Sequence, residues 1–256
     1  MGRPVAFNGV DGMPMSIHPR PAASQRTALR DAGTNAAAAK RQQAWQQALR
    51  VLAIRLDNLG DVLMTTPALA ALRESLPQAR ITLLASPGTA CLQPHLRQID
   101  DLIPYAAPWM KASAPSHALD AVAMIRRLQA ERFDAAVIFT SFSQSPLPAA
   151  QFCQLAGIDL RLAHCHENPY HLLSDWIADP EPHQTVRHEV QRQLDLVAAI
   201  GCRTADPRLR FAIDAASRLA AAARLKVLGL GAGSRRKWLV LHPGASAPSR
   251  RYPAEQ

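Results

Sequence analysis

The chain has 256 residues, of which 48% are hydrophobic and 19% are charged. This apolar fraction excludes disorder throughout, and the length suits one large domain or one domain with part of a second. No run approaches the roughly 20 apolar residues that a membrane-spanning helix needs. The N-terminus lacks the apolar core of a secretory signal, so we expect a cytoplasmic protein. The four cysteines have no framework spacing, which predicts reduced thiols.

The net charge of +9 is distributed unevenly along the chain. Residues 1–50 carry +5 and residues 216–256 carry +7, whereas residues 51–215 carry −3. A nucleic-acid-binding protein usually carries its positive charge on the folded face that touches phosphate. We therefore expect no nucleic-acid partner, whereas basic ends suit attraction to an anionic membrane surface.

Residues 1–49 mix Gly, Pro, Ser, Ala and Arg without a sustained strand or helix period. A short helix rich in Ala and Gln fits residues 36–49, but its apolar face is thin. We therefore predict a disordered or weakly helical extension over 1–49 and leave it out of the fold.

Strands and helices alternate from residue 50 onward. A buried strand is predicted over 50–55 and a helix over 61–76. The remaining predicted strands cover 79–85, 99–105 and 133–139, and the remaining predicted helices cover 119–130, 147–156 and 186–200. Gly157 and Gly201 are typical helix stops. This alternation favours an α/β fold with a doubly wound parallel sheet over residues 50–215.

Residues 216–237 are predicted to be a linker. The Gly-Leu-Gly-Ala-Gly run at 229–233 lacks the following helix that a dinucleotide motif requires. A strand over 238–242 and a helix start at 252–255 follow. One strand and one helical turn cannot bury a core, so residues 238–256 resemble the opening of a second, incomplete α/β domain.

The sharpest local feature is the segment between the first strand and the first helix, with Arg55, Gly60 and Asp61. Ligands of open α/β sheets bind at that edge. Gly60 would let the backbone turn tightly, and the helix N-terminus would favour the Asp61 carboxylate. Such a carboxylate can accept a proton from an attacking hydroxyl, although spacing alone favours an N-cap role for Asp61. Asp57 is expected to be a loop or capping residue.

Two further segments contain candidate binding residues. His242 ends the predicted strand, and the loop that follows it up to Ser246 consists of small residues whose backbone N–H groups suit a phosphate. Arg250 and Arg251 could neutralise a pyrophosphate, or they could be surface arginines on a solvated loop. Adjacent side chains at 164–166 (His, Cys, His) point to opposite faces of an extended segment, and no second pair has ligand spacing, so we predict no metal site.

The stretch Arg50–Leu69, which contains RLDNLGDV, resembles the opening of glycosyltransferase family 9. This family comprises the ADP-heptose:lipopolysaccharide heptosyltransferases of Gram-negative bacteria. The similarity continues in the family's order through residues 77–84, 107–111, 167–170, 187–197 and 242–245. It therefore extends over residues 50–256.

The resemblance implies a GT-B architecture, in which two Rossmann-like domains face a cleft. The N-terminal domain would take a lipid-linked saccharide acceptor of the lipid A–Kdo type, and the C-terminal domain a nucleotide-sugar, ADP-heptose. Transfer would invert the anomeric carbon and would need neither a metal nor another cofactor. The enzyme would be cytoplasmic, with peripheral association with the anionic inner-membrane surface.

By the same analogy, Asp61 would be the general base that deprotonates the acceptor hydroxyl. Arg55, at the family's basic strand-end position, would help to hold acidic groups in the cleft, and Arg55 and Gly60 would contact the acceptor or its phosphates. Ser246 and Arg250 fall where the family binds the phosphates of the donor.

The sequence departs from the family pattern in two ways. Residues 250–253 are Arg-Arg-Tyr-Pro where the family usually has Lys-Arg-Trp-Pro, which keeps the charge but changes the geometry of the donor contact. A complete donor domain would also need on the order of a hundred residues beyond Gln256. Two hypotheses follow: a heptosyltransferase-type enzyme, or a catalytically incomplete acceptor-binding module that retains only the N-terminal domain.

Overall fold

The computed structural model describes residues 39–110, 118–230, 237, 239–242, 244–245 and 251–253. The chain forms two compact units, Met1–Gln47 and Ala48–Gln256. In the first unit, the described residues 39–46 are helical, in agreement with the short helix predicted there. The predicted donor contacts Ser246 and Arg250 lie outside the described residues.

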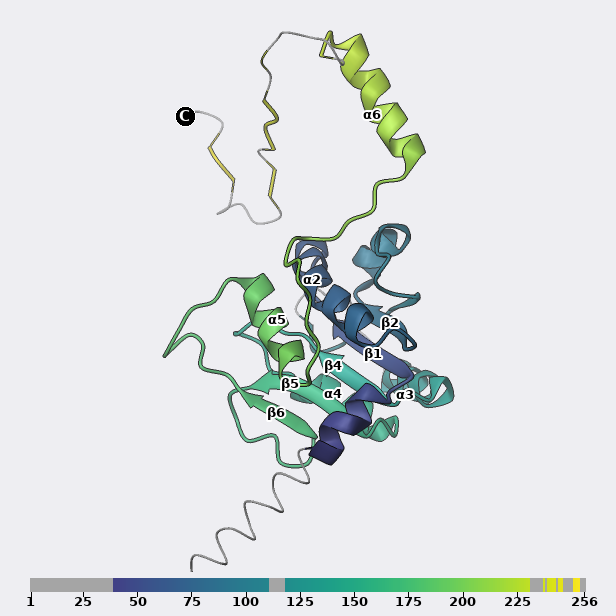
Figure 1. Cartoon of the computed structure of the whole chain (residues 1–256), viewed down its shortest axis with the longest axis vertical. Coiled ribbons are helices and arrows are strands. Elements are labelled where there is room, and N and C mark those ends of the chain that lie inside the picture. Colours follow the sequence, from purple (N-terminus) through teal and green to yellow (C-terminus); the bar gives the residue numbers. More distant parts are fainter. Residues whose placement is uncertain are drawn as a thin grey trace, which may run out of the picture. The chain divides into compact units, whose positions relative to one another are not determined.

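Among the described residues of the second unit, six strands form one sheet in which every pairing is parallel. The strands are β1 (Arg50–Arg55), β2 (Arg80–Ala85), β3 (Asp101–Pro104), β4 (Ala135–Ile138), β5 (Leu160–Cys165) and β6 (Asp175–Ala178). Their order across the sheet is β3-β2-β1-β4-β5-β6 (Figure 1). The direction of winding reverses between β1 and β4, so the predicted doubly wound α/β sheet is confirmed.

The helices of this unit are α2 (Leu59–Ser75), α3 (Ala118–Glu131), α4 (Leu147–Leu155), α5 (Glu189–Ala198) and α6 (Ala215–Val227), with a 3-10 helix, η1, over Pro87–His95. Helices α2 and α5 pack together on one face of the sheet, and α3 and α4 cover the other (Figure 1). No described helix is both long and apolar enough to cross a membrane.

The alternation of side chains along β1 directs its residues to both layers. Leu52 and Ile54 belong to the core cluster that α3 and α4 complete. Arg55 points to the other face, where its guanidinium contacts Glu189 at the start of α5. The last residue of β1 therefore lies at the carboxyl edge of the sheet, beneath α2 and α5.

Five segments differ from the prediction. Strands β5 and β6 and the helix η1 lie where the sequence predicted no element. Helix α6 occupies much of the predicted linker, because its alanine-rich sequence favours a helix and the Asp214 carboxylate accepts the Ser217 N–H at 2.7 Å as an N-cap. The described residues 239–242 are not in a strand, since a strand needs a partner to pair with.

Candidate functional site

A cavity of about 910 Å³ opens at the carboxyl edge of the parallel sheet. Its lining comes from the loops that follow four adjacent strands: residues 56–58 after β1, 86–88 after β2, and parts of 105–110 after β3 and of 139–149 after β4. Parallel strands end at the same edge, so these loops meet although they are distant in the sequence. Open α/β sheets bind their ligands at this edge, beside the point where the winding reverses.

Arg55 is fully buried, with 0% of its side chain exposed, and it lies among three carboxylates. Its Nε is 2.7 Å from Asp57 Oδ2, its Nη1 is 2.9 Å from Glu189 Oε1, and its Nη2 is 3.5 Å from Asp61 Oδ1. We call these four residues the Arg55 cluster. A buried guanidinium needs compensating charge, and three carboxylates give the cluster an excess of negative charge.

Asp61 lies in the first turn of α2, at the third position after the N-cap residue Asn58. Its Oδ2 accepts the backbone N–H of Asn58 at 3.1 Å, which closes a capping box. Its Oδ1 faces Arg55, and 37% of the side chain remains exposed. Asp61 therefore helps to cap α2, although the N-cap residue is Asn58 and not Asp61 as the capping alternative expected. Asp61 is not among the residues that line the cavity, but its hydrogen-bond partner Asn58 is.

Asp57 connects the loops around the cavity. Its carboxylate pairs with Arg55 and accepts a hydrogen bond from Gln144 Nε2, and its carbonyl accepts one from Ser86 Oγ at 2.7 Å. Only 10% of its side chain is exposed. Asp57 is thus a loop residue, as predicted, and it ties the ends of β1, β2 and β4 together.

Glu189 is not among the site residues predicted from the sequence, although it lies within the family-like stretch 187–197. Its carboxylate accepts from Gln193 Nε2 at 2.7 Å in addition to its pairing with Arg55. The same Gln193 nitrogen donates to the carbonyl of Thr140 at 3.0 Å, so α5 connects Arg55 to the end of β4. The one local signal was the amphipathic helix itself, which has to pack its apolar side on the sheet.

Gly60 does not make the tight turn that the sequence predicted. It lies inside the first turn of α2, its φ is not positive, and a Cβ added to it would meet nothing within 4 Å. The chain turns two residues earlier, at Asn58, whose extended backbone (φ −77°, ψ 169°) any residue can adopt. Gly60 therefore leaves open space next to Asp61.

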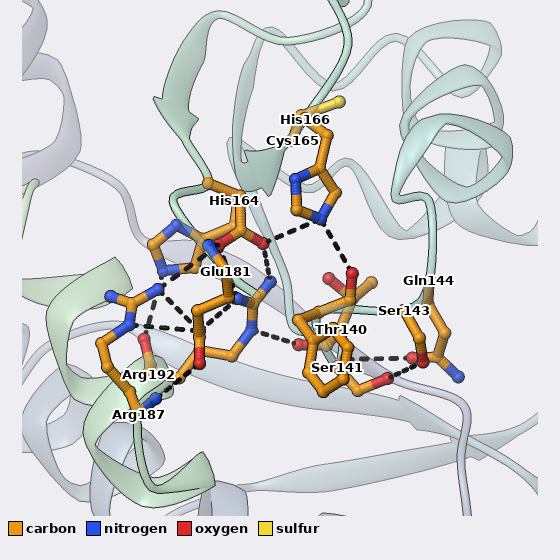
Figure 2. A network of polar contacts seen from close by, with 12 residues as sticks. Thr140, Ser141, Ser143, Gln144, His164, Cys165, His166, Glu181, Arg187 and Arg192 are labelled. Atoms are coloured by element: carbon orange, nitrogen blue, oxygen red, sulfur yellow. Dashed lines mark hydrogen bonds and ion pairs between the residues drawn. The ribbon is translucent and has the colours of Figure 1, made fainter. Parts of the chain in front are cut away.

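A second buried arginine, Arg192, belongs to α5 itself and lies about one turn after Glu189. Arg192 Nη2 is 2.6 Å from Asp179 Oδ2, and its Nη1 is 2.7 Å from Glu181 Oε2. Arg187 Nη2 reaches the same Glu181 oxygen at 2.9 Å, so the two guanidinium groups converge on one carboxylate (Figure 2). Arg192 Nε also donates to the carbonyl of Thr140 at 2.9 Å. We call Arg192, Asp179, Glu181 and Arg187 the Arg192 cluster.

The carboxyl groups of the Arg192 cluster have lowered pKa values, as expected in a charged, hydrogen-bonded network. Burial alone would raise the pKa of Asp179 and of Glu181, but hydrogen bonds from Arg192 and from backbone N–H groups outweigh burial and hold both pKa values below their usual range. The neighbouring His164 has a lowered pKa because it is buried and because Arg192 is close. These groups connect the first turn of α5 to the segment that precedes it.

The His-Cys-His segment has the alternation that the sequence predicted. His164 Nε2 lies 3.2 Å from the carbonyl oxygen of Arg192, whereas Cys165 belongs to the core on the opposite face. His166 Nε2 contacts the carbonyl oxygen of Phe142 at 2.8 Å (Figure 2). Within the part of the chain that the structure describes, no group of three or more His, Cys, Asp or Glu side chains is placed to hold a metal ion.

The fold is that of solved glycosyltransferases of family 9. A family 9 glycosyl transferase from Veillonella parvula superposes with a TM-score of 0.59 at 18% identity over 81% of this chain. The ADP-heptose LPS heptosyltransferase II of E. coli superposes with a TM-score of 0.51 at 17% identity over 69% of it. The chain spans 56% and 50% of those two proteins, about half of each.

No protein-family model and no curated protein matches the chain. At identities of 17–18% the likeness is one of fold. The resemblance to glycosyltransferase family 9 is therefore confirmed at that level, and the roles of individual residues remain predictions.

Proposed function

We propose that the chain carries the acceptor domain of an inverting, metal-independent glycosyltransferase of the family 9 type. The reaction moves a heptose or a related sugar from ADP-heptose to a lipid-linked saccharide of the lipopolysaccharide core. The shared fold supports this proposal, and so does the cavity at the carboxyl edge of the sheet. A lipid-linked acceptor would bring the protein to the cytoplasmic face of the inner membrane, which the basic ends of the chain suit.

The observation that carries the proposal is the Asp61 carboxylate. It is 37% exposed, lies 3.5 Å from the buried Arg55 guanidinium, and accepts the backbone N–H of Asn58, which lines the cavity. Such a carboxylate can take the proton of an acceptor hydroxyl while the hydroxyl oxygen attacks the anomeric carbon. The bond from that carbon to the ADP oxygen breaks as the new bond forms on the opposite face, which inverts the configuration.

The remaining parts of the site have supporting roles in this proposal. Arg55 holds the Asp61 carboxylate through its charge, and Gly60 keeps the space beside Asp61 free for the acceptor. Ser246 and Arg250, which lie outside the described residues, would bind the phosphates of the donor. No cofactor or metal enters the reaction as we propose it.

A second candidate function is that of an acceptor-binding module without transfer activity. One observation favours it: every described residue that lines the cavity lies between Ile54 and Ala149. Binding at this cavity therefore requires no residue from the later part of the chain. This candidate predicts saturable binding of acceptor without cleavage of the donor.

The decisive experiment is a transfer assay on protein isolated from its native cells, with its intact mass measured first. With ADP-heptose and a lipid-linked core acceptor, Asp61→Asn is expected to slow transfer by about 10²–10⁴-fold, the usual effect of removing a general base. Asparagine retains an oxygen that can accept the Asn58 N–H, so α2 should still form. Glu74→Gln, at the other end of the same helix, is the control for loss of a charge.

The possible outcomes separate the two candidates. Transfer at the normal rate by Asp61→Asn would show that Asp61 is not the base. Acceptor binding without any transfer by the unmodified protein would favour the binding module. Absence of both would sink the proposed function altogether.

A further inference from the structure

The cavity has an aromatic wall after β3. Tyr105 and Trp109 both line it, and the half-buried Trp109 ring packs edge-on against two other rings. Its centroid lies 4.8 Å from Phe152 with 67° between the planes, and 6.0 Å from Tyr105 with 66° between the planes. Contacts of this geometry are favourable and hold the indole in one orientation. The wall is therefore a rigid apolar surface, suited to the C–H face of a sugar ring.

The other walls supply hydrogen-bonding groups. Asp57 and Asn58 follow β1, Ser86 follows β2, and the loop after β4 adds Ser143 and Gln144. Gln144 is held in place because its Oε1 accepts the Ser141 N–H at 3.0 Å while its Nε2 donates to Asp57. A mostly apolar cavity with a few fixed polar groups is typical of small-molecule sites. One aromatic wall facing polar walls matches a sugar ring, which has an apolar face and hydroxyl edges.

The charge at the cavity distinguishes between classes of sugar. Among its described lining residues, Asp57 has the one charged side chain. Asp61 and Glu189 add two carboxylates around the single buried guanidinium of Arg55. At the rim, the Ser145 hydroxyl donates to the Glu167 carboxylate at 2.8 Å. A carboxylate or phosphate on the ligand would therefore meet excess negative charge, whereas an uncharged sugar would not.

We propose that the sugar that enters this cavity is uncharged and stacks on Trp109. The inference rests on the proposed function and narrows its acceptor: the accepting ring is a neutral aldose, not an acidic sugar of the Kdo type. Specificity then comes from the indole face, the hydroxyl contacts of the opposite walls and repulsion of anionic rings by the carboxylates.

The test compares two probes on the full chain by calorimetry, supported by saturation-transfer NMR. One is the methyl glycoside of an L-glycero-D-manno-heptose, which is uncharged, and the other is the methyl glycoside of Kdo, which carries a carboxylate. We expect the neutral glycoside to bind at least about tenfold more tightly, the equivalent of a 1.4 kcal/mol preference. The difference should shrink as salt is raised, because salt screens partly exposed charges.

Three variants examine the two parts of the inference. Trp109→Ala should weaken binding of the neutral glycoside about tenfold, whereas Trp109→Phe, which keeps an aromatic face, should recover most of it. Trp176→Ala is the matched control, because Trp176 is 44% exposed and does not line the cavity. Glu167→Gln should improve binding of the Kdo glycoside and leave the neutral one unchanged. Urea unfolding of each variant separates a lost contact from a lost fold.

The outcomes also separate this inference from the proposed function. Equal or tighter binding of the Kdo glycoside would overturn the inference, and transfer to an acidic acceptor would still uphold the enzyme. Absence of neutral binding while transfer proceeds would overturn it as well. Binding of the neutral glycoside without transfer from ADP-heptose would uphold the inference and contradict the proposed enzyme.

Discussion

Arg55 and Arg192 are both buried arginines surrounded by carboxylates, and both are connected with the start of α5: Glu189 pairs with Arg55, and Arg192 lies in the helix about one turn later. Arg192 is 1% exposed, and its partners Asp179 and Glu181 are 1% and 2% exposed. Arg55 is 0% exposed, but the side chains of its three partners are 10%, 20% and 37% exposed. The guanidinium of Arg192 donates hydrogen bonds to Asp179, Glu181 and the Thr140 carbonyl. None of the three nitrogens of Arg55 has a partner with hydrogen-bond geometry.

The difference separates a structural network from a candidate site. Buried polar groups in a folded protein are nearly always hydrogen-bonded, and exceptions call for an explanation. The Arg192 cluster satisfies its donors and holds the loop before α5 against the sheet. The Arg55 cluster has three carboxylates around one buried cation, and these carboxylates are partly exposed to solvent. Its carboxylates therefore remain accessible to a ligand, whereas those of the Arg192 cluster do not.

The largest effect on stability is expected from Arg192→Met. Removing the cation leaves Asp179 and Glu181 buried with only Arg187 to compensate them. Breaking a buried ion pair in this way costs about 3–5 kcal/mol in the free energy of unfolding. Urea unfolding followed by circular dichroism measures the loss.

Arg208→Ala is the control for that measurement. Arg208 also pairs with a carboxylate, Asp206 at 2.8 Å, but its own side chain is 85% exposed. Exposed pairs contribute little to stability because water and salt screen them. We expect no measurable change, and a loss similar to that of Arg192→Met would contradict the distinction between buried and exposed pairs.

Lowering the pH should weaken the Arg192 cluster in two steps. His164 has a folded pKa below its ordinary value of about 6.5, so the unfolded chain takes up the proton first and stability falls as pH drops below that value. Asp179 and Glu181 have lowered pKa values too. Their contribution is present above the ordinary carboxyl values near 4 and is lost as pH falls toward the folded pKa values.

Urea unfolding between pH 7 and pH 3 tests both steps. Each unit of difference between folded and unfolded pKa corresponds to about 1.4 kcal/mol. His164→Gln should remove the step that begins near neutrality and retain the acid step. Stability that is constant between pH 7 and pH 5 in the unmodified protein would contradict the assignment to His164.

Arg55→Met should cost less than Arg192→Met. Its three carboxylates lose their common cation, but each remains partly hydrated, so we expect a loss of about 1–3 kcal/mol. Adding Glu189→Gln to Arg55→Met should restore part of the stability. A loss as large as that of Arg192→Met would mean that the two clusters do not differ.

The parts of the fold that the sequence predicts are those with continuous apolar strands. β4 is buried along its length and β1 is buried after its first residue, Arg50, and parallel sheets covered on both faces demand such strands. β5 escaped prediction because it contains Arg161, which is only 8% exposed. Its guanidinium is satisfied by the carbonyls of His171 and Leu172. A pattern of apolar residues cannot predict a buried strand whose arginine becomes hydrogen-bonded to backbone carbonyls only after folding.

The residues of the candidate site also divide into those that the local sequence predicts and those that it does not. Arg55 and Asp61 lie close together in the sequence, so the strand and helix around them place both at the carboxyl edge. Glu189 and Gln144 come from α5 and from the loop after β4. Their contacts with Arg55 and Asp57 depend on how α5 and the β4 loop pack, which no local pattern encodes.

The smallest expected effect has opposite signs for stability and for binding. Gly60 sits in the first turn of α2 with open space around it, so Gly60→Ala should raise the free energy of unfolding by about 0.5–1 kcal/mol. The added methyl group occupies space next to Asp61 and should weaken acceptor binding. Gly157→Ala is the control, because its φ of +77° strains any side chain, and it should lower stability. A loss of stability in Gly60→Ala would contradict the regular helical first turn of α2, which positions Asp61.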